Sequence, residues 1–244
     1  MSLGLFSYLS QVVFQLVFEK PRWKEWFYET YVVANQSAPV IIFCVVFAAI
    51  VTVVEAAFHM RMVIHDTSMV PGFAALFILR ELGVVIACLL VVSRVGAGYA
   101  SQVAIMHITE QIEALKMLGI NPIKYIVVPR LVACVLGCVV LSVLANSACL
   151  IGATLVSSNE MGISNGEFIS AMRRFVGGKD IFFSMIKASV FGAIIPLTAC
   201  FLGFRSQGGA EGVGQTTTQS VVASSVLIIV ADFVLCFAFS PFYD

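Results

Sequence analysis

Charged residues are scarce in this sequence. Only 11% of its 244 residues are Asp, Glu, Lys or Arg, whereas 60% are hydrophobic. About a quarter of the residues of a typical soluble domain are charged, so this chain could not cover itself with enough polar surface to stay in water. The acidic and basic residues balance to a formal net charge of zero, which argues against nucleic acid as a partner.

Signatures of catalysis and of nucleotide or metal binding are missing as well. The stretch Gly178-Lys179-Asp180 is the nearest approach to a phosphate-binding loop, but Asp stands where the motif needs Ser or Thr, so we expect no ATP site and no cofactor in this chain. The seven cysteines all lie in apolar blocks without a Cys-x-x-Cys pair, which favours reduced packing residues. No metal-ligand spacing relates the histidines, which are His59, His65 and His107. An intramembrane hydrolase or lipid synthase is therefore disfavoured.

Long apolar blocks dominate the sequence. Crossing about 30 Å of hydrocarbon takes roughly 20 apolar residues in a helix, and these blocks are apolar on every face, which favours helices over barrel strands. The blocks are residues 38–58, 69–93, 131–156, 181–204 and 220–239. The sequence thus predicts an all-α integral membrane protein with five transmembrane helices in one domain, residues 1–244.

The first 30 residues differ from these blocks. Ser and Gln interrupt the apolar stretch at 3–18, and both tryptophans of the chain, Trp23 and Trp26, stand among three cations at 20–24. Trp and cationic residues favour the headgroup level, so we expect an interfacial elbow helix over 1–30. A short spanning helix is the alternative. No cleavable signal is recognised, so the first spanning helix should serve as the targeting signal.

Cations in the flanks predict the orientation, because cytoplasmic loops carry an excess of Lys and Arg. A cytoplasmic N-terminus places eight cations inside and four outside. The inside set is Lys20, Arg22, Lys24, Arg94, Lys116, Lys124, Arg130 and Arg205, and the outside set is Arg61, Arg173, Arg174 and Lys179. We therefore expect a cytoplasmic N-terminus and an external C-terminus, with an exported segment near 157–180 that is partly helical.

The third block contains a stripe of small residues at helical spacing. Its members are Cys134, Cys138, Ser142, Ala145, Cys149 and Gly152. Small residues let helix backbones approach closely in lipid, so the stripe predicts a packing face.

A second periodic segment lies between the second and third blocks, at 101–119. Isoleucine and leucine recur there at helical spacing, and Glu110 and Glu113 lie on another face, with Thr109 and Lys116 between the two faces. Gly119 and Pro122 should stop the helix. The pattern predicts a surface helix that either covers the bundle or docks into a cytoplasmic motor.

Several motifs resemble one known family, the MlaE/YrbE permeases. They are Arg80-Glu81-Leu82-Gly83, Arg94-Val95-Gly96-Ala97, the stretch Thr109 to Leu115, Pro129-Arg130, and the stretch Gly208 to Thr218. The match runs from about Met69 to the C-terminus in the same order and spacing. The chain departs from the family pattern at Val84, where Pro is usual, at Ser93, where Gly is frequent, and at Gln102-Val103-Ala104, where an acidic residue, an apolar residue and Gly are common.

The resemblance implies the permease subunit of an ATP-driven lipid transporter in the bacterial inner membrane. It implies a homodimer, a separate cytoplasmic ABC ATPase that binds the ATP, an MCE-domain protein on the outer side, and a small STAS-type cytoplasmic subunit as a further partner. Phospholipid is the implied substrate. The helix at 101–119 becomes the coupling helix, in which Thr109, Glu110, Glu113 and Lys116 face the ATPase. A channel or a scaffold subunit without ATP-coupled transport is the alternative.

Charges inside the spanning blocks mark the candidate substrate site. Arg80 and Glu81 lie midway through the second block, where each would cost roughly 2.5–3.5 kcal/mol if it faced lipid. Glu55 lies near the outer end of the first block. We expect these three, with Leu76 and Phe77, to line a lipid cavity between two copies of the chain. Structural charges tied to a neighbouring helix are the alternative.

Two further intramembrane charges predict a structural ion pair. Lys187 lies six residues into the fourth block and Asp232 lies seven residues from the outer end of the fifth. At about 1.5 Å per residue the two depths are roughly 9 and 10 Å. The short loop makes the two helices antiparallel neighbours, so we expect Lys187 and Asp232 to meet.

Overall fold

The computed structural model describes residues 5–18, 23–63 and 69–242. Within those ranges the chain consists of helices joined by short turns, without a strand, and five helical segments are long and apolar enough to cross a membrane. The predicted fold class, an all-α membrane protein with five spans, is confirmed.

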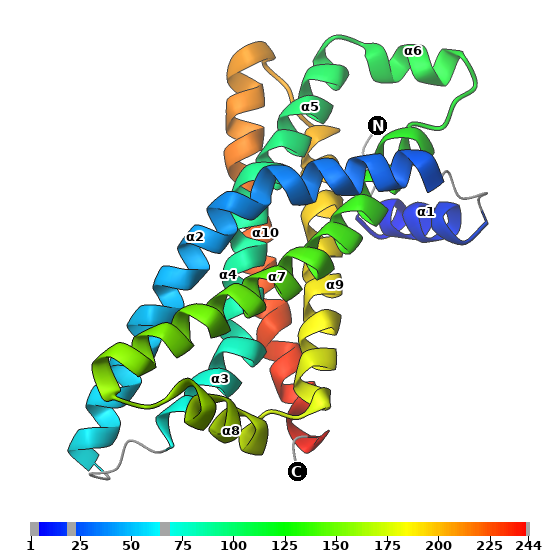
Figure 1. Cartoon of the computed structure of the whole chain (residues 1–244). Coiled ribbons are helices and arrows are strands. Elements are labelled where there is room, and N and C mark those ends of the chain that lie inside the picture. The colour runs from blue at the N-terminus through cyan, green and yellow to red at the C-terminus, as the bar shows by residue number, and fades with distance from the viewer. Residues whose placement is uncertain (1–4, 19–22, 64–68, 243–244) are drawn as a thin grey trace.

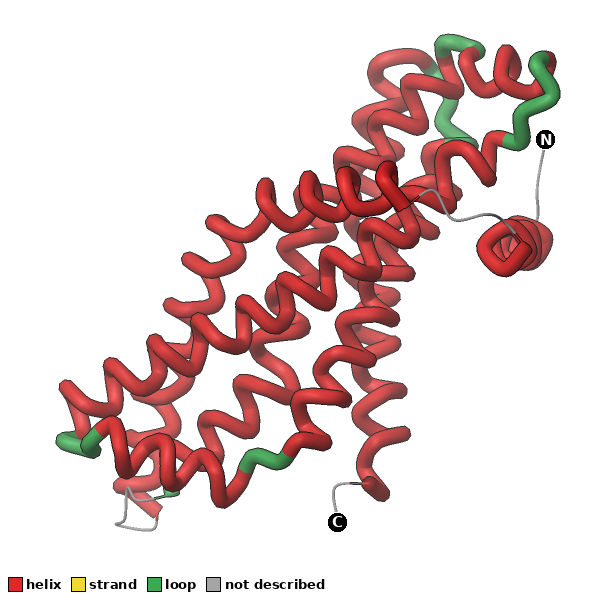
Figure 2. The backbone as a smooth tube through the Cα atoms, turned by 45° about the vertical axis from the view of Figure 1, so that its right-hand side comes forward, coloured by secondary structure: helices red, strands yellow, loops and turns green. Residues whose placement is uncertain are grey.

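Helix α1 (Leu5–Phe18) lies beside the bundle rather than within it (Figures 1 and 2). Its 14 residues extend about 21 Å, too little to cross the hydrocarbon. Tyr8 and Val12 are buried against the start of the third span, and the Tyr8 ring lies 5.4 Å from that of Phe201. Burial raises the pKa of the Tyr8 phenol. The expected interfacial helix is therefore present, although it is shorter than the range 1–30.

Helix α2 (Trp23–Val63) contains the first span and begins earlier than expected. Residues 23–30, predicted in the elbow, are its first turns, because nothing between the polar start and the apolar block breaks a helix. Pro39 lies inside α2 and removes one backbone hydrogen bond. In Figure 1 the N-terminal part of α2 runs across one end of the bundle, and the rest descends along its side.

The second span is a continuous helical segment, residues 70–108, interrupted by two π-helical turns. It comprises α3 (Val70–Phe77), the π turn η1 (Ile78–Leu82), α4 (Gly83–Val91), the π turn η2 (Val92–Gly96) and α5 (Ala97–Ile108). π turns inside α-helices are frequent at functional sites. Here η1 carries Arg80 and Glu81, and η2 carries Arg94.

The single helix predicted at 101–119 is wrong. Residues 101–108 continue the second span as α5, and a separate short helix, α6 (Gln111–Met117), follows. Glu110 separates them with a φ of +60°, a left-handed conformation that ends one helix and redirects the chain into the next. The amphipathic spacing persists across the break, which is why periodicity alone suggested one helix.

Three more long helices complete the bundle. The π turn η3 (Ile123–Val127) leads into α7 (Val128–Met161), and α8 (Asn165–Phe175) follows on the outside of the bundle as a short amphipathic helix. Helices α9 (Gly178–Gly203) and α10 (Gly209–Phe239) form the last two spans, and the 3-10 turn η4 (Ser240–Phe242) ends the described chain. Each of these spans is longer than its apolar block because polar turns extend it.

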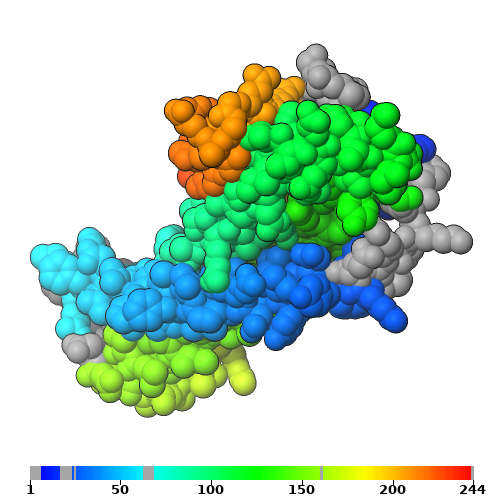
Figure 3. Space-filling view, turned by 90° about the horizontal axis from the view of Figure 1, so that it is seen from above, coloured from blue at the N-terminus to red at the C-terminus, as the bar shows by residue number. Residues whose placement is uncertain are grey.

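The arrangement has two distinct ends. Helices α1 and α6 lie near one end and α8 and η4 lie near the other (Figure 1). Figure 3 looks onto the α6 end, where the N-terminal half of α2 runs along one side and the α5–α6 region and the start of α10 lie on the other. Helix α2 packs along α7, α7 packs on α9, and α10 packs on α9 and α5.

The stripe of small residues on α7 is the main packing face, as predicted. Its members are all buried. A Cβ on Gly192 of α9 would lie 2.9 Å from the Cys134 carbonyl oxygen, and a Cβ on Gly152 would lie 3.1 Å from the Val46 side chain. Helix α7 therefore approaches α9 and α2 at backbone distance.

Candidate functional site

A cluster of charged side chains lies inside the bundle, in the half nearer α8. Arg80 and Glu81 come from η1, Asp180 and Lys187 from α9, and Asp232 from α10. At about 1.5 Å per residue, Arg80 lies roughly 15 Å from the start of its span, Lys187 roughly 14 Å from the start of α9, and Asp232 roughly 10 Å from the end of α10. We call these five residues the charged cluster.

Lys187 is the centre of the cluster. Its side chain is only 1% exposed, and its Nζ lies 2.8 Å from Asp232 Oδ1 and 2.8 Å from Glu81 Oε1. The same ammonium donates to the Arg80 carbonyl oxygen and to Cys236 Sγ, each at 3.0 Å. The predicted contact between Lys187 and Asp232 is thus present, and Glu81 is a second carboxylate on the same ammonium.

Arg80 forms the other ion pair of the cluster. Its Nε donates to Asp180 Oδ1 at 2.7 Å, and Asp180 Oδ2 accepts the Gly177 backbone N–H at 2.8 Å. Asp180 therefore stabilises the first turn of α9 while it neutralises Arg80. The aspartate is almost fully buried, whereas the Arg80 side chain is 28% exposed.

The cluster is partly open. The Glu81 side chain is 32% exposed and that of Asp232 is 19% exposed. Three carboxylates face two cations, so the cluster carries one more negative charge than positive. Next to it, Arg80, Phe175, Lys179 and Asp180 line a cavity of about 360 Å³ at the α8 end.

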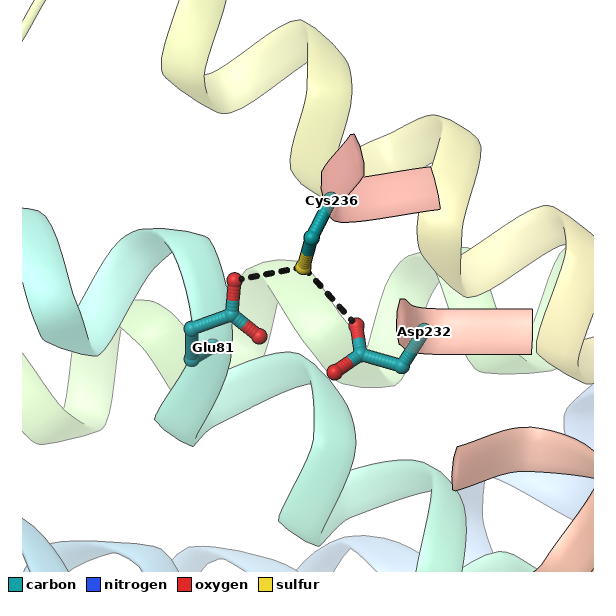
Figure 4. Close-up of side chains that lie close together, drawn as sticks. All are labelled: Glu81, Asp232 and Cys236. Carbon is teal, nitrogen blue, oxygen red and sulfur yellow. Dashed lines mark hydrogen bonds between the residues drawn. The ribbon is translucent and has the colours of Figure 1, made fainter. Parts of the chain in front are cut away.

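A metal ion does not fit the cluster. Glu81, Asp232 and Cys236 bring their ligand atoms within 4.8 Å of one another (Figure 4). However, Lys187 Nζ is within 2.8–3.0 Å of one atom of each of the three. The ammonium already supplies the positive charge at their centre and would repel a metal cation.

Glycine in the first motif makes room for a polar contact behind the cluster. A Cβ on Gly83 would lie 1.9 Å from Asn146 Oδ1, so only glycine leaves space for this amide. Asn146 Nδ2 donates to Ser184 Oγ at 3.0 Å. A polar link between α7 and α9 therefore lies directly beside η1.

The other motifs lie at the α6 end. Arg94 in η2 donates to the Gln36 carbonyl oxygen of α2. Gly208 and Gly209 have φ values of +90° and +68°, which glycine adopts readily, and a Cβ on Gly212 would overlap the Gln207 carbonyl oxygen at 1.7 Å. These glycines form the tight turn into α10.

The predicted substrate residues divide into two groups. Arg80 and Glu81 belong to the cluster, and Leu76 and Phe77 precede it in α3, with Phe77 51% exposed. Glu55 lies on the exposed side of α2, where it pairs with His59 at 3.5 Å. Among the described residues, no hydrogen bond or ion pair joins Glu55 to the cluster.

The predicted coupling residues surround the α5–α6 break. Thr109 donates its hydroxyl to the Ile105 carbonyl oxygen, and Glu110 is the residue with the left-handed backbone. Glu113 Oε1 lies 3.5 Å from Lys116 Nζ. All four residues are exposed.

Sequence reasoning missed Asp180 and Cys236, and it missed the pairing of Glu81 with Lys187. Asp180, Ser184 and Lys187 recur at helical spacing, and all three are buried. That spacing places the three side chains on one face of a helix and could have indicated that Asp180 belongs to the same polar site as Lys187. The expected start of the fourth span at residue 181 left Asp180 outside the block and placed Lys187 too near the surface to meet Glu81.

Comparison with known proteins identifies the family of this chain. Residues 26–238 match the family model described as Permease MlaE. The chain is 30% identical to a probable ABC transporter permease protein of Rickettsia prowazekii over 235 residues, which cover 96% of this chain and 90% of that relative. It is 35% identical over 162 residues to the intermembrane phospholipid transport system permease protein MlaE of Haemophilus influenzae, covering 66% of this chain and 62% of the relative.

A plant protein is also similar. The chain is 38% identical over 164 residues to the chloroplastic protein TRIGALACTOSYLDIACYLGLYCEROL 1 of Arabidopsis thaliana, covering 67% of this chain and 47% of the relative. The five helical spans and the charged cluster within them define a multi-pass membrane protein with a polar site at membrane depth. The chain belongs to the MlaE permease family, as the motifs predicted.

Proposed function

We propose that this permease moves phospholipid as one half of a dimer in an ATP-driven transporter of the bacterial inner membrane. The observation that carries the proposal is the charged cluster. Charges at this depth are costly in lipid, and this cluster is partly exposed at Arg80, Glu81 and Asp232. A headgroup in a wet cavity supplies the polar surroundings that these side chains need. The name of the Haemophilus relative supports phospholipid as the substrate.

A second copy of the chain would complete the cavity. Helix α10 is the least buried of the five spans, and it exposes large apolar side chains such as Phe233 and Phe237. The partly exposed carboxylates Glu81 and Asp232 lie on η1 and α10, so a second copy against α10 would cover them together with Leu76 and Phe77. The lipid chains would then lie between the two copies and the headgroup against Arg80 and Glu81.

The α6 end would receive the ATPase. Met117, the last residue of α6, is 90% exposed, and the following Leu118 is 75% exposed. Glu110 and Glu113 in the same segment are also exposed. An exposed apolar tip flanked by charges is typical of a docking surface. We expect an ABC ATPase there, with a STAS-type subunit on the same side and an MCE-domain protein at the α8 end.

The cation count supports a cytoplasmic α6 end and an external α8 end. Since α1 and η4 lie at opposite ends of the bundle, the two termini should lie on opposite sides of the membrane. A C-terminal reporter that works only in the cytoplasm should stay silent. Activity of that reporter would contradict the orientation.

The decisive experiment reconstitutes the chain with its partner ATPase in vesicles that contain a fluorescent phospholipid. We expect lipid movement that requires ATP hydrolysis and disappears when the ATPase is supplied without this chain. An ATPase variant unable to hydrolyse ATP is the control. Lipid or ion movement at an equal rate without ATP would favour a channel, and hydrolysis without any lipid movement would favour a scaffold.

A further inference from the structure

A second candidate site lies at the α6 end, away from the charged cluster. A cavity of about 480 Å³ opens between the first turns of α2, the end of α5 and the start of α7. Lys24, Tyr28 and Glu29 of α2 line one side, and Tyr125 and Arg130 line the other. This cavity is separate from the charged cluster that would bind the transported lipid.

Arg130 is the unusual residue in the wall. Its Nη2 donates to Gln102 Oε1 at 2.9 Å, and its guanidinium lies 5.2 Å from the centre of the Tyr99 ring. Its Nη1 is buried and has no hydrogen-bond partner among the described residues. A buried charged donor without an acceptor is destabilising. The Arg130 side chain lines the cavity, so an anionic oxygen against its guanidinium would stabilise the site.

The charge of Arg130 is not neutralised by the described part of the chain. The side chains that contact it are neutral, namely the Gln102 amide, the Tyr99 ring and the Cys200 thiol. No carboxylate of the described residues lies within ion-pair distance of it. Lys24 adds a second cation, and Glu29 is the one carboxylate in the lining. The cavity therefore carries an excess of positive charge.

The location indicates the source of the anion. Tyr28 and Tyr125 are both at least half exposed at the rim, and Tyr, Trp and Lys are characteristic of the membrane–water interface. Lipid headgroups occupy that level, and their phosphates accept hydrogen bonds from Arg and Lys. The Tyr28 hydroxyl supplies a further donor.

We propose that this cavity binds the phosphate group of an anionic lipid of the leaflet on the α6 side, with Arg130 and Lys24 as the main contacts. The bound lipid would fasten the start of α2 to α5 and α7. It would hold these helices together at the end where the chain meets its proposed ATPase. The inference concerns binding and does not depend on transport.

Gln102→Glu is the most informative variant. The new carboxylate would face Arg130 at the position of the present amide, neutralise it, and leave the thermal stability of the protein unchanged or higher. Binding of a phosphate group should weaken about tenfold, because one charge-assisted contact is lost. Arg130→Gln should weaken it at least as much.

The control is Arg61→Gln. Arg61 is an exposed cation at the other end of the same helix as Lys24, so its loss changes the net charge equally without touching the cavity. Lys24→Gln should weaken binding, and Arg61→Gln should leave it unchanged.

The measurement is native mass spectrometry of the full chain with its partner ATPase. Phosphatidylglycerol, phosphatidylcholine and inorganic phosphate are the probes. We expect preferential retention of phosphatidylglycerol, reduced in the Gln102→Glu and Arg130→Gln variants. Retention that resists inorganic phosphate supports a lipid headgroup, whereas displacement by inorganic phosphate supports a phosphate anion from solution. Equal retention of the two lipids, or wild-type retention of phosphatidylglycerol in both variants, would overturn the proposal.

Discussion

Lys187 and Asp232, which are 45 positions apart in the sequence, meet at 2.8 Å inside the membrane-spanning bundle. Since Glu81 binds the same ammonium at the same distance, the lysine holds three spans together. Loss of Lys187 therefore leaves the Glu81 and Asp232 carboxylates without their cationic partner, whereas loss of Asp232 leaves Lys187 paired with Glu81.

This asymmetry predicts the outcome of a double-mutant cycle. Lys187→Met should destabilise the protein by about 3–5 kcal/mol, the range for an uncompensated buried charge. Asp232→Leu should cost less, and the double variant should be less damaged than the sum of the two single variants. Thermal unfolding of the purified protein in detergent is the measurement. Additive losses would show that the two side chains act independently.

Asp180 should show two separable roles. Asp180→Asn retains an oxygen that can accept the Gly177 N–H but loses the charge that neutralises Arg80. Asp180→Ala loses both, so it should be less stable than Asp180→Asn by about 1 kcal/mol, the value of a helix cap. Thermal unfolding of the two variants tests this order. Equal stability would mean that the cap at α9 contributes nothing.

The close approach of α9 to α7 predicts a steric effect at Gly192. A Cβ there would lie 2.9 Å from both the Cys134 carbonyl oxygen and the Val135 Cα, so Gly192→Ala should cost about 1–3 kcal/mol. Gly98→Ala is the matched control, because a Cβ at Gly98 has no neighbour within 4 Å and alanine favours helix. If Gly192→Ala were as stable as Gly98→Ala, the two helices would not pack at backbone distance.

The extent to which the sequence predicted this structure depends on the kind of signal. Five apolar blocks were enough to find the spans, because hydrocarbon demands length and apolarity. The block ends were displaced because α2, α7 and α10 continue as helices through polar residues outside the lipid. The break at Glu110 was missed because the apolar spacing runs through it, and a left-handed residue other than glycine has little sequence signature.

The charged cluster was only partly predictable for a related reason. The contact between Lys187 and Asp232 could be predicted from their equal depths in the membrane, because the two residues lie on neighbouring antiparallel helices. The pairing of Glu81 with Lys187 was missed because the helix of Glu81 is distant in sequence and the direction of the Glu81 side chain depends on a π-helical turn. Glu55 was placed near the cluster by depth alone, but it lies on the outer side of α2, and depth says nothing about which face of a helix is exposed.

The α6 end should tolerate loss of charge less well than other exposed surfaces. Charge reversal at Glu110 or Glu113 should reduce stimulation of the partner ATPase and lipid transport severalfold while leaving the fold intact. The Glu113 variant tests the charge alone. A substitution at Glu110 can also disturb the local backbone, because Glu110 adopts a strained left-handed conformation. Arg61→Glu, a reversal at an exposed site on the other end, is the control. Full stimulation in both acidic-residue variants would contradict docking at α6.

Lipid contact at the charged cluster is the central claim, and site-specific photo-crosslinking tests it most directly. Crosslinkers at Leu76, Phe77 and Arg80 should capture phospholipid in the complex with its ATPase, and capture should fall during ATP hydrolysis as the lipid moves on. A crosslinker at Ile151, an exposed position on α7, should capture bilayer lipid at a rate that ATP does not change. Capture from α9 and α10 alone, or ATP-independent capture at Phe77, would contradict a substrate site at the cluster.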